Sequence, residues 1–98
     1  MRVRYKLACS ARRDLQGISD YLTAEAGEDV ALRIVTGILD AIVNVSTQPR
    51  AGVAAGTFGE GVRKFPVGKY MVYYRPFRSR IEILHVFHGA RDQGKAWS

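Results

Sequence analysis

Two histidines near the C-terminal end are the residues of this sequence best suited to acid–base chemistry. His85 and His88 stand three positions apart in the run ILHVFHGARD, with arginines and tyrosines on either side. Cleavage of RNA through its 2′-hydroxyl needs a general base, a general acid for the leaving oxygen, and cations that stabilise the phosphorane. The residues that supply these groups in principle are His85, His88, Arg75, Arg80, Arg91, Tyr73 and Tyr74.

The spacing of the two histidines argues against a shared catalytic site. Residues three apart on a β-strand point to opposite faces, unless a β-bulge lies between them. We therefore expect His88 to belong to a turn that ends a strand, and Arg75 to be a solvated hairpin residue or a bidentate ligand for phosphate or carboxylate. A catalytic cluster of His85, His88, Arg75 and Arg91 is the less favoured alternative.

The sequence lacks the residue spacings that are typical of phosphate-binding loops, zinc sites and nucleophilic hydrolases. Gly52, Gly56 and Gly59 are not followed by the Lys-Ser/Thr pair of a phosphate-binding loop. One cysteine and two histidines give no zinc-binding pattern. The glycines, serines and aspartates form no nucleophile elbow. We therefore expect no metal and no cofactor.

The composition predicts one folded domain over residues 1–98. A hydrophobic fraction of 47% excludes disorder, and 98 residues suffice for one core. No apolar run is long enough for a membrane span, and the first residues do not resemble a signal peptide. Because Cys9 stands alone, no internal disulfide is expected, and a reducing cytoplasm is the simplest setting.

The net charge of +6 is distributed unevenly along the chain. Six acidic residues and one basic residue lie between Asp14 and Asp40, whereas the remainder holds fourteen basic and three acidic residues. This asymmetry predicts an acidic helical end and a basic sheet end that attracts anionic partners. Nucleic acid and an acidic protein segment are both candidates.

The last third of the chain predicts a three-stranded antiparallel meander. Residues 62–65, 70–75 and 81–87 are rich in Val, Ile, Tyr and Phe, which favour strands. The turn signals at 66–68 and 76–79 separate these runs. Strict alternation places Ile81, Ile83, His85 and Phe87 on one face.

The first third predicts a strand and a helix. Residues 2–7 alternate between basic and apolar types, which indicates a strand at the edge of the sheet. Ser10 is the expected N-cap of the first helix, with Asp14 as a favourable charge in its first turn. Gly27 is suited to end this helix.

A second helix is expected from Glu28 or Asp29 to about Thr47, where Pro49 prevents its continuation. Residues 48–60 are rich in glycine and small side chains, which predicts a mobile loop and no functional site.

The second helix and the central strands carry more apolar surface than the packing of one helical layer on one sheet requires. The second helix has an additional apolar stripe formed by Leu32, Leu39 and Val43. Either the first helix or another protein chain covers this stripe. The central strands are apolar on both faces, and the helices can cover one of them. The opposite face is therefore a candidate docking surface.

Four separated stretches, in the same order, resemble the ParE branch of the RelE/ParE toxin superfamily. They are the Ala-x-x-Asp-Leu-x-x-Ile-x-x-Tyr spacing at 11–21, GVRKFPVGKY at 61–70, VYYR at 72–75 and IEILHVFHGARD at 81–92. The resemblance covers nearly the whole chain. It departs from the family before the first helix, where Leu-Ala-Cys replaces the usual Leu-Ser-Pro, and at His85, where a basic residue is usual.

The resemblance implies an α+β fold in which a helical hairpin packs on one face of an antiparallel sheet of about four strands. It also implies the toxin of a type II toxin–antitoxin pair, which inhibits DNA gyrase without catalysing a reaction. Such a toxin is neutralised by a ParD-like antitoxin in a hetero-oligomer, contacts DNA only indirectly through that antitoxin, and does not involve a membrane. The alternative is a RelE-like, ribosome-dependent mRNA endoribonuclease.

Under this interpretation the functional residues are those of binding surfaces. An amphipathic antitoxin helix would meet the apolar residues Tyr21, Leu22, Leu32, Leu39 and Val43. Its acidic residues would meet Arg63, Lys64, Arg75 and Arg80. Arg91 and Trp97 are the candidates for contact with the target, although Trp97 can equally belong to a frayed C-terminal tail.

Overall fold

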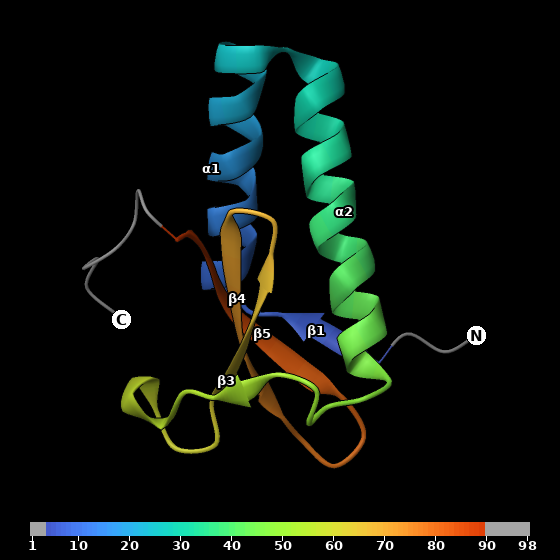
Figure 1. The fold of residues 1–98 in the computed structure, drawn as a ribbon, viewed down its shortest axis with the longest axis vertical. Helices are drawn as coiled ribbons and strands as arrows, with labels where there is room; N and C mark the ends of the chain where they lie inside the picture. The colour runs from blue at the N-terminus through green and yellow to red at the C-terminus, as the bar shows by residue number, and fades with distance from the viewer. Residues whose placement is uncertain (1–3, 90–98) are drawn as a thin grey trace.

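A strand, two helices and then the remaining strands follow one another along the chain (Figure 1). The computed structural model describes residues 4–89. Its elements are β1 (Tyr5–Leu7), α1 (Cys9–Ala26), α2 (Glu28–Ser46), β2 (Val53–Ala54), the 3-10 helix η1 (Gly56–Phe58), β3 (Arg63–Val67), β4 (Tyr70–Pro76) and β5 (Ile81–His88). The expected order of strand, helical hairpin and meander is confirmed.

The sheet has five strands in the order β1-β5-β4-β3-β2. The pairings of β2 with β3, β3 with β4 and β4 with β5 are antiparallel, whereas β1 runs parallel to β5. The α+β class is confirmed, but the sheet is mixed and contains one strand more than expected. The alternation in residues 2–7 indicates which side chains face inward, and it says nothing about the direction of the partner strand.

The helical hairpin turns at Gly27, as the sequence predicts. Gly27 has φ 96°, in the range that favours glycine, and its N–H donates to the carbonyls of Leu22 and Thr23. Glu28 and Asp29 then place two carboxylates in the first turn of α2, where they interact favourably with the helix dipole.

Ser10 and Asp14 bind strand β5, in contrast to their expected roles at the start of α1. The helix begins one residue before Ser10 and has no side-chain cap. Ser10 Oγ donates to the carbonyl of Leu84 at 2.6 Å, and Asp14 Oδ2 accepts from the N–H of Val86 at 2.9 Å. Both predictions were wrong because these side chains continue the hydrogen bonding of the β5 edge beyond the end of β1.

A β-bulge at Leu84 changes which faces the residues of β5 occupy. Tyr74 pairs with Ile83 and Tyr73 pairs with His85, so Leu84 has no partner on β4. The alternation expected for this strand therefore holds as far as Ile83 and reverses after it. The prediction that Ile83 and His85 share a face was wrong.

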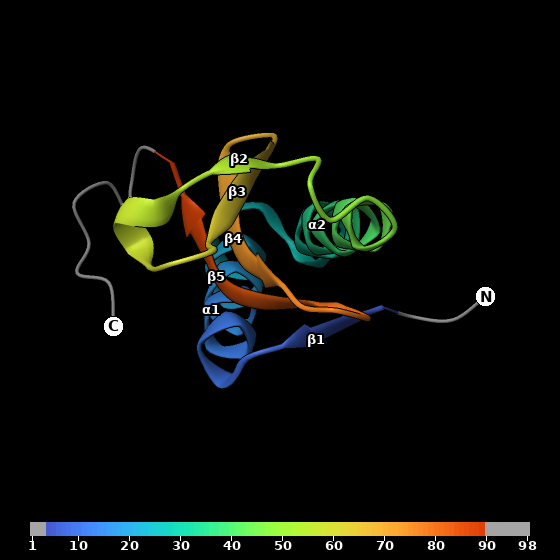
Figure 2. The same ribbon diagram turned by 90° about the horizontal axis from the view of Figure 1, so that it is seen from below.

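The core lies between the helical hairpin and the face of the twisted sheet that turns towards it (Figure 2). Apolar stripes of both helices pack on alternate residues of β3, β4 and β5. At about 25 cal/mol per Å² of apolar surface, this burial is the main stabilising contribution. The buried members are Ala11, Leu15, Ile18, Ile38, Ile42, Phe65, Tyr70, Val72, Tyr74, Ile81, Ile83 and Val86.

The connection between α2 and β3 is tied to the core by Tyr74. Its buried hydroxyl donates to the carbonyl of Pro49 at 2.7 Å and accepts from the N–H of Gly52 at 3.0 Å. A Cβ atom at Gly52 would lie 2.7 Å from both the Tyr74 hydroxyl and the carbonyl of Lys64, so glycine is required there. Residues 48–60 also contain β2 and η1. The expected mobile loop is thus an ordered segment, because the Tyr74 hydroxyl, the pairing of β2 with β3 and the side chain of Arg63 all provide it with hydrogen bonds.

Candidate functional site

His85 is buried at the junction of β5 and α1. It is 7% exposed, its Nδ1 lies 2.9 Å from Asp14 Oδ2, and its ring stacks on Phe87 with centroids 4.8 Å apart. The same carboxylate oxygen accepts the N–H of Val86. His85 therefore helps to join the helix to the strand.

His88 lies on the opposite face of the sheet. It pairs with Tyr70, and the two rings meet edge to face at 5.3 Å. The bulge precedes both histidines, so it does not bring them together, and their predicted separation is confirmed.

The remaining members of the alternative catalytic cluster do not assemble around one imidazole. Arg75 shares a face with His85, but its Nε donates to the carbonyl of Glu60 at 3.1 Å. Tyr73 lies between them on that face, and burial raises the pKa of its hydroxyl, which makes it a still weaker acid than an ordinary tyrosine. Arg91 lies outside the described residues.

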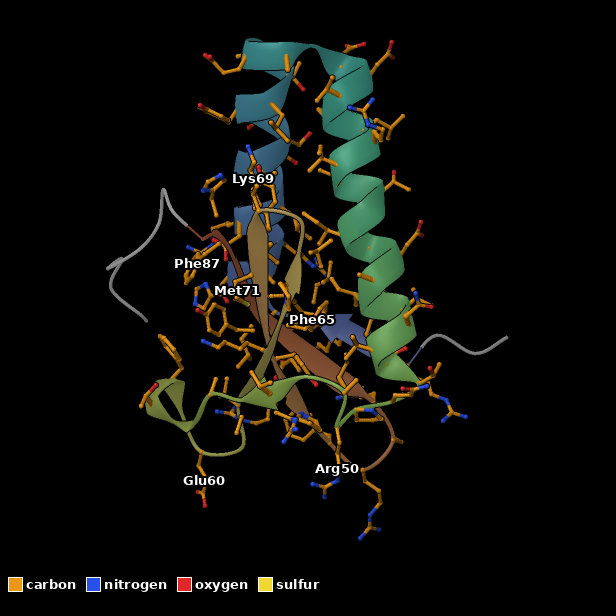
Figure 3. All side chains as sticks on the ribbon, in the orientation of Figure 1. Arg50, Glu60, Phe65, Lys69, Met71 and Phe87 are labelled. Carbon is orange, nitrogen blue, oxygen red and sulfur yellow. The ribbon has the colours of Figure 1, made fainter. Side chains whose placement is uncertain are left out.

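The face of the sheet away from the helices carries an aromatic cluster. The rings of Phe58 and Tyr73 lie 4.8 Å apart, and those of Tyr73 and Phe87 lie 5.8 Å apart. Figure 3 shows Met71 and Phe87 beside each other on this part of the sheet. The docking role expected for this face stays a prediction.

An apolar groove runs between the helical hairpin and the turn that joins β3 to β4. Its volume is about 510 Å³. Figure 3 shows Lys69 at the tip of that turn, next to the helices. The groove is lined by Tyr21, Leu22, Ile34, Gly37, Ile38, Val67, Gly68, Lys69, Tyr70 and His88.

The five apolar residues expected to bind an antitoxin helix occupy different places. Tyr21, which is 47% exposed, and Leu22 line the apolar groove. Leu32 is 69% exposed and belongs to a separate hollow of the hairpin. Leu39 packs against the core and Val43 is partly buried, so the fold itself covers much of their stripe.

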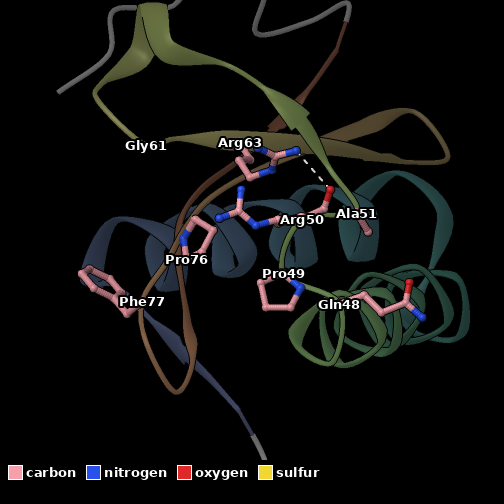
Figure 4. A pocket seen from close by; sticks show the side chains of 8 residues that line it. All are labelled: Gln48, Pro49, Arg50, Ala51, Gly61, Arg63, Pro76 and Phe77. Carbon is pink, nitrogen blue, oxygen red and sulfur yellow. Dashed lines mark hydrogen bonds between the residues drawn. The ribbon is translucent and has the colours of Figure 1, made fainter.

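A basic pocket of about 790 Å³ lies at the C-terminal end of α2 (Figure 4). It is formed by the connection after α2, the start of β3 and the end of β4. Its lining residues are Gln48, Pro49, Arg50, Ala51, Gly61, Arg63, Pro76 and Phe77.

The four basic residues expected to attract acidic groups are likewise divided. Arg63 lines the basic pocket. Lys64 pairs with Tyr73 and so faces away from the helices. Arg75 contacts the loop at Glu60, and Arg80 lies exposed in the turn between β4 and β5.

Sequence reasoning missed several residues of these two hollows. Ile34 and Val67 line the apolar groove, whereas their sequence patterns indicated only a core helix face and a hairpin turn. Arg50 and Phe77 line the basic pocket from two turns far apart in sequence. An aromatic residue within a basic turn was the available signal for Phe77. Trp97 lies outside the described residues.

Two negative observations concern the described part of the chain. Residues 4–89 contain no group of three or more His, Cys, Asp or Glu side chains that could hold a metal ion. Neither of the long helices in this range is apolar enough over a sufficient length to cross a membrane.

The fold and its surfaces define a class of small α+β proteins in which a helical hairpin and a twisted sheet leave an apolar groove between them. A family model described as the ParE toxin of the type II toxin–antitoxin system parDE matches residues 5–93. The chain therefore belongs to the ParE toxin family, which confirms the resemblance found in its sequence.

A solved structure described as the chromosomal ParDE toxin–antitoxin system from P. aeruginosa contains a similar chain. The TM-score is 0.75 at 22% sequence identity, and the match covers 88% of this chain and 95% of that chain. At this identity the likeness establishes the fold. A search of curated proteins finds no match.

Proposed function

We propose that this ParE-family chain is a toxin that inhibits DNA gyrase and is neutralised when a ParD-like antitoxin binds its apolar groove. The toxin acts by binding and does not catalyse a reaction. The toxin and the antitoxin form a hetero-oligomeric complex, in which only the antitoxin contacts promoter DNA directly.

The apolar groove is the observation that carries the antitoxin part of this proposal. Its lining is mostly aliphatic and aromatic, and it includes the exposed ring of Tyr21. An amphipathic helix inserts apolar side chains at spacings of three and four residues into grooves of this kind. Exposed apolar residues that become buried in a partner favour such a complex by the hydrophobic effect.

The target part of the proposal is supported by family membership and by the separation of the candidate catalytic groups. An RNase mechanism needs a base, an acid and cations around one phosphate. Here His85 is bound by Asp14, His88 lies on the other face, and Arg75 is turned to the loop at Glu60. A surface that binds gyrase needs no such convergence.

Gyrase supercoiling in the presence of the purified full chain tests this function. We expect a stoichiometric excess to inhibit supercoiling, and addition of the antitoxin to restore it. The second measurement maps the ends of cellular transcripts after expression of the chain is induced. An SOS response without new transcript ends agrees with gyrase inhibition. Codon-positioned cuts together with unaffected supercoiling would establish the RelE-like endoribonuclease instead.

A further inference from the structure

Two arginine side chains line the basic pocket, and no carboxylate of the described chain neutralises them. Arg63 Nη2 donates to the carbonyls of Arg50 and Gly52, and its Nε is buried without a hydrogen-bond partner. Within residues 4–89 no ion pair includes Arg50 or Arg63. Figure 4 shows both side chains directed towards the same space. Two guanidinium groups close together repel each other. An anion bound between them would relieve this repulsion and would be attracted by both.

The rim of the basic pocket also carries apolar rings beside the two arginines. Phe77 is 49% exposed, and the rings of Pro49 and Pro76 also line the pocket. The Phe77 N–H donates to the carbonyl of Arg80 at 2.7 Å, which fixes the turn that carries the ring. An exposed aromatic ring next to arginines is the arrangement on which nucleic acid bases stack.

The surroundings of the pocket favour a polyanionic ligand. No acidic residue lines the pocket, and the exposed turn beside it adds Arg78 and Arg80. A free nucleoside monophosphate carries up to two negative charges, and a nucleic acid strand carries one on each successive phosphodiester, so either can neutralise two guanidinium groups, whereas a single carboxylate neutralises one. The volume of about 790 Å³ also exceeds the needs of one acidic side chain.

From these observations we propose that the basic pocket binds a nucleoside phosphate, either free or within single-stranded nucleic acid. Arg50 and Arg63 hold the phosphate, and the base stacks on Phe77. This site differs in position and chemistry from the apolar groove, and it does not depend on inhibition of gyrase or on capture of an antitoxin.

Binding to the purified full chain is measured with three probes: inorganic phosphate, AMP and a fluorescein-labelled ten-residue oligothymidylate. Arg50→Gln should weaken AMP and oligonucleotide binding about tenfold, since it removes a charge-assisted contact. Phe77→Leu should weaken these two probes by a similar factor of roughly ten and leave inorganic phosphate unaffected, since phosphate has no base to stack. Arg33→Gln, which removes an equal charge from the exposed side of α2, is the matched control and should change binding less than about twofold.

Circular dichroism and thermal unfolding establish that each variant keeps the fold. Oligonucleotide binding that is much tighter than AMP binding assigns the site to single strands, and equal affinities assign it to the free nucleotide. The proposal is overturned by an absence of saturable binding, by equal losses in Arg50→Gln and Arg33→Gln, or by an unaffected AMP affinity in Phe77→Leu. It is also overturned if a glutamate-rich peptide of the same charge binds more tightly than the oligonucleotide and loses that binding in Arg50→Gln.

Discussion

Asp14 connects α1 to the sheet through two hydrogen bonds to neighbouring residues of β5. One carboxylate oxygen lies 2.9 Å from both the His85 imidazole and the Val86 N–H. Strand β1 pairs with residues 81–83 and ends there, so Asp14 supplies the next acceptor along this edge of β5, in a partly buried place.

Replacement of Asp14 by alanine should therefore destabilise the fold. We expect the free energy of unfolding to fall by about 2–3 kcal/mol, because an N–H and an imidazole both lose their acceptor. Urea denaturation followed by circular dichroism measures this loss. The control is Asp20→Ala on the same helix, where the exposed carboxylate bonds Gln16 and its removal should cost less than about 0.5 kcal/mol. Equal effects of the two variants would show that the bonds of Asp14 to β5 contribute little.

At the scale of elements, the helical hairpin has two sides with different surroundings. Tyr21 lies on the side that forms the apolar groove with the β3–β4 turn, whereas Leu32 lies in a separate hollow. Both residues are exposed and both belong to a helix. They therefore offer a matched pair that separates antitoxin binding in the groove from binding elsewhere on the hairpin.

Tyr21→Glu should weaken antitoxin binding far more than Leu32→Glu. A charge placed in a buried apolar interface costs several kcal/mol, so we expect a loss of roughly 100-fold for Tyr21→Glu and less than about threefold for Leu32→Glu. Calorimetric titration with a ParD-like antitoxin measures both affinities. The reverse order of effects would place the antitoxin on the other side of the hairpin.

For the whole molecule, the uneven charge and the apolar groove act on different steps of association. Most basic residues lie outside the segment from Asp14 to Asp40, and Figure 3 shows one of them, Arg50, projecting on the side away from the turn between the helices. Charges of this kind accelerate encounter with an acidic partner, whereas apolar contacts chiefly determine how long the complex lasts.

Salt should consequently slow formation of the antitoxin complex more than it accelerates dissociation. Between 50 mM and 500 mM NaCl we expect the association rate constant to fall about tenfold and the dissociation rate constant to change less than about threefold. Surface plasmon resonance at several salt concentrations measures both constants. Dissociation that responds more strongly than association would indicate that charge pairs hold the complex together.

The amino-acid sequence by itself determined the two helices, the first strand, the meander and their order, but not β2 and η1. The turn at Gly27, the meander and the separation of His85 from His88 follow from local conformational preferences and from periods of 3.6 and 2 residues. Four stretches in one order also sufficed to indicate the ParE family. These features depend on residues close together in the chain or on a pattern of residue types.

Only the tertiary structure decided which distant residues meet. Asp14 was predicted at a helix end and instead completes the edge of β5, and the bulge at Leu84 depends on the register between two strands. The basic pocket requires the connection after α2 and the β4–β5 turn to lie together, and a buried hydroxyl of Tyr74 holds that connection in place. Such contacts arise from packing between elements, which the periodicity of a single segment does not encode.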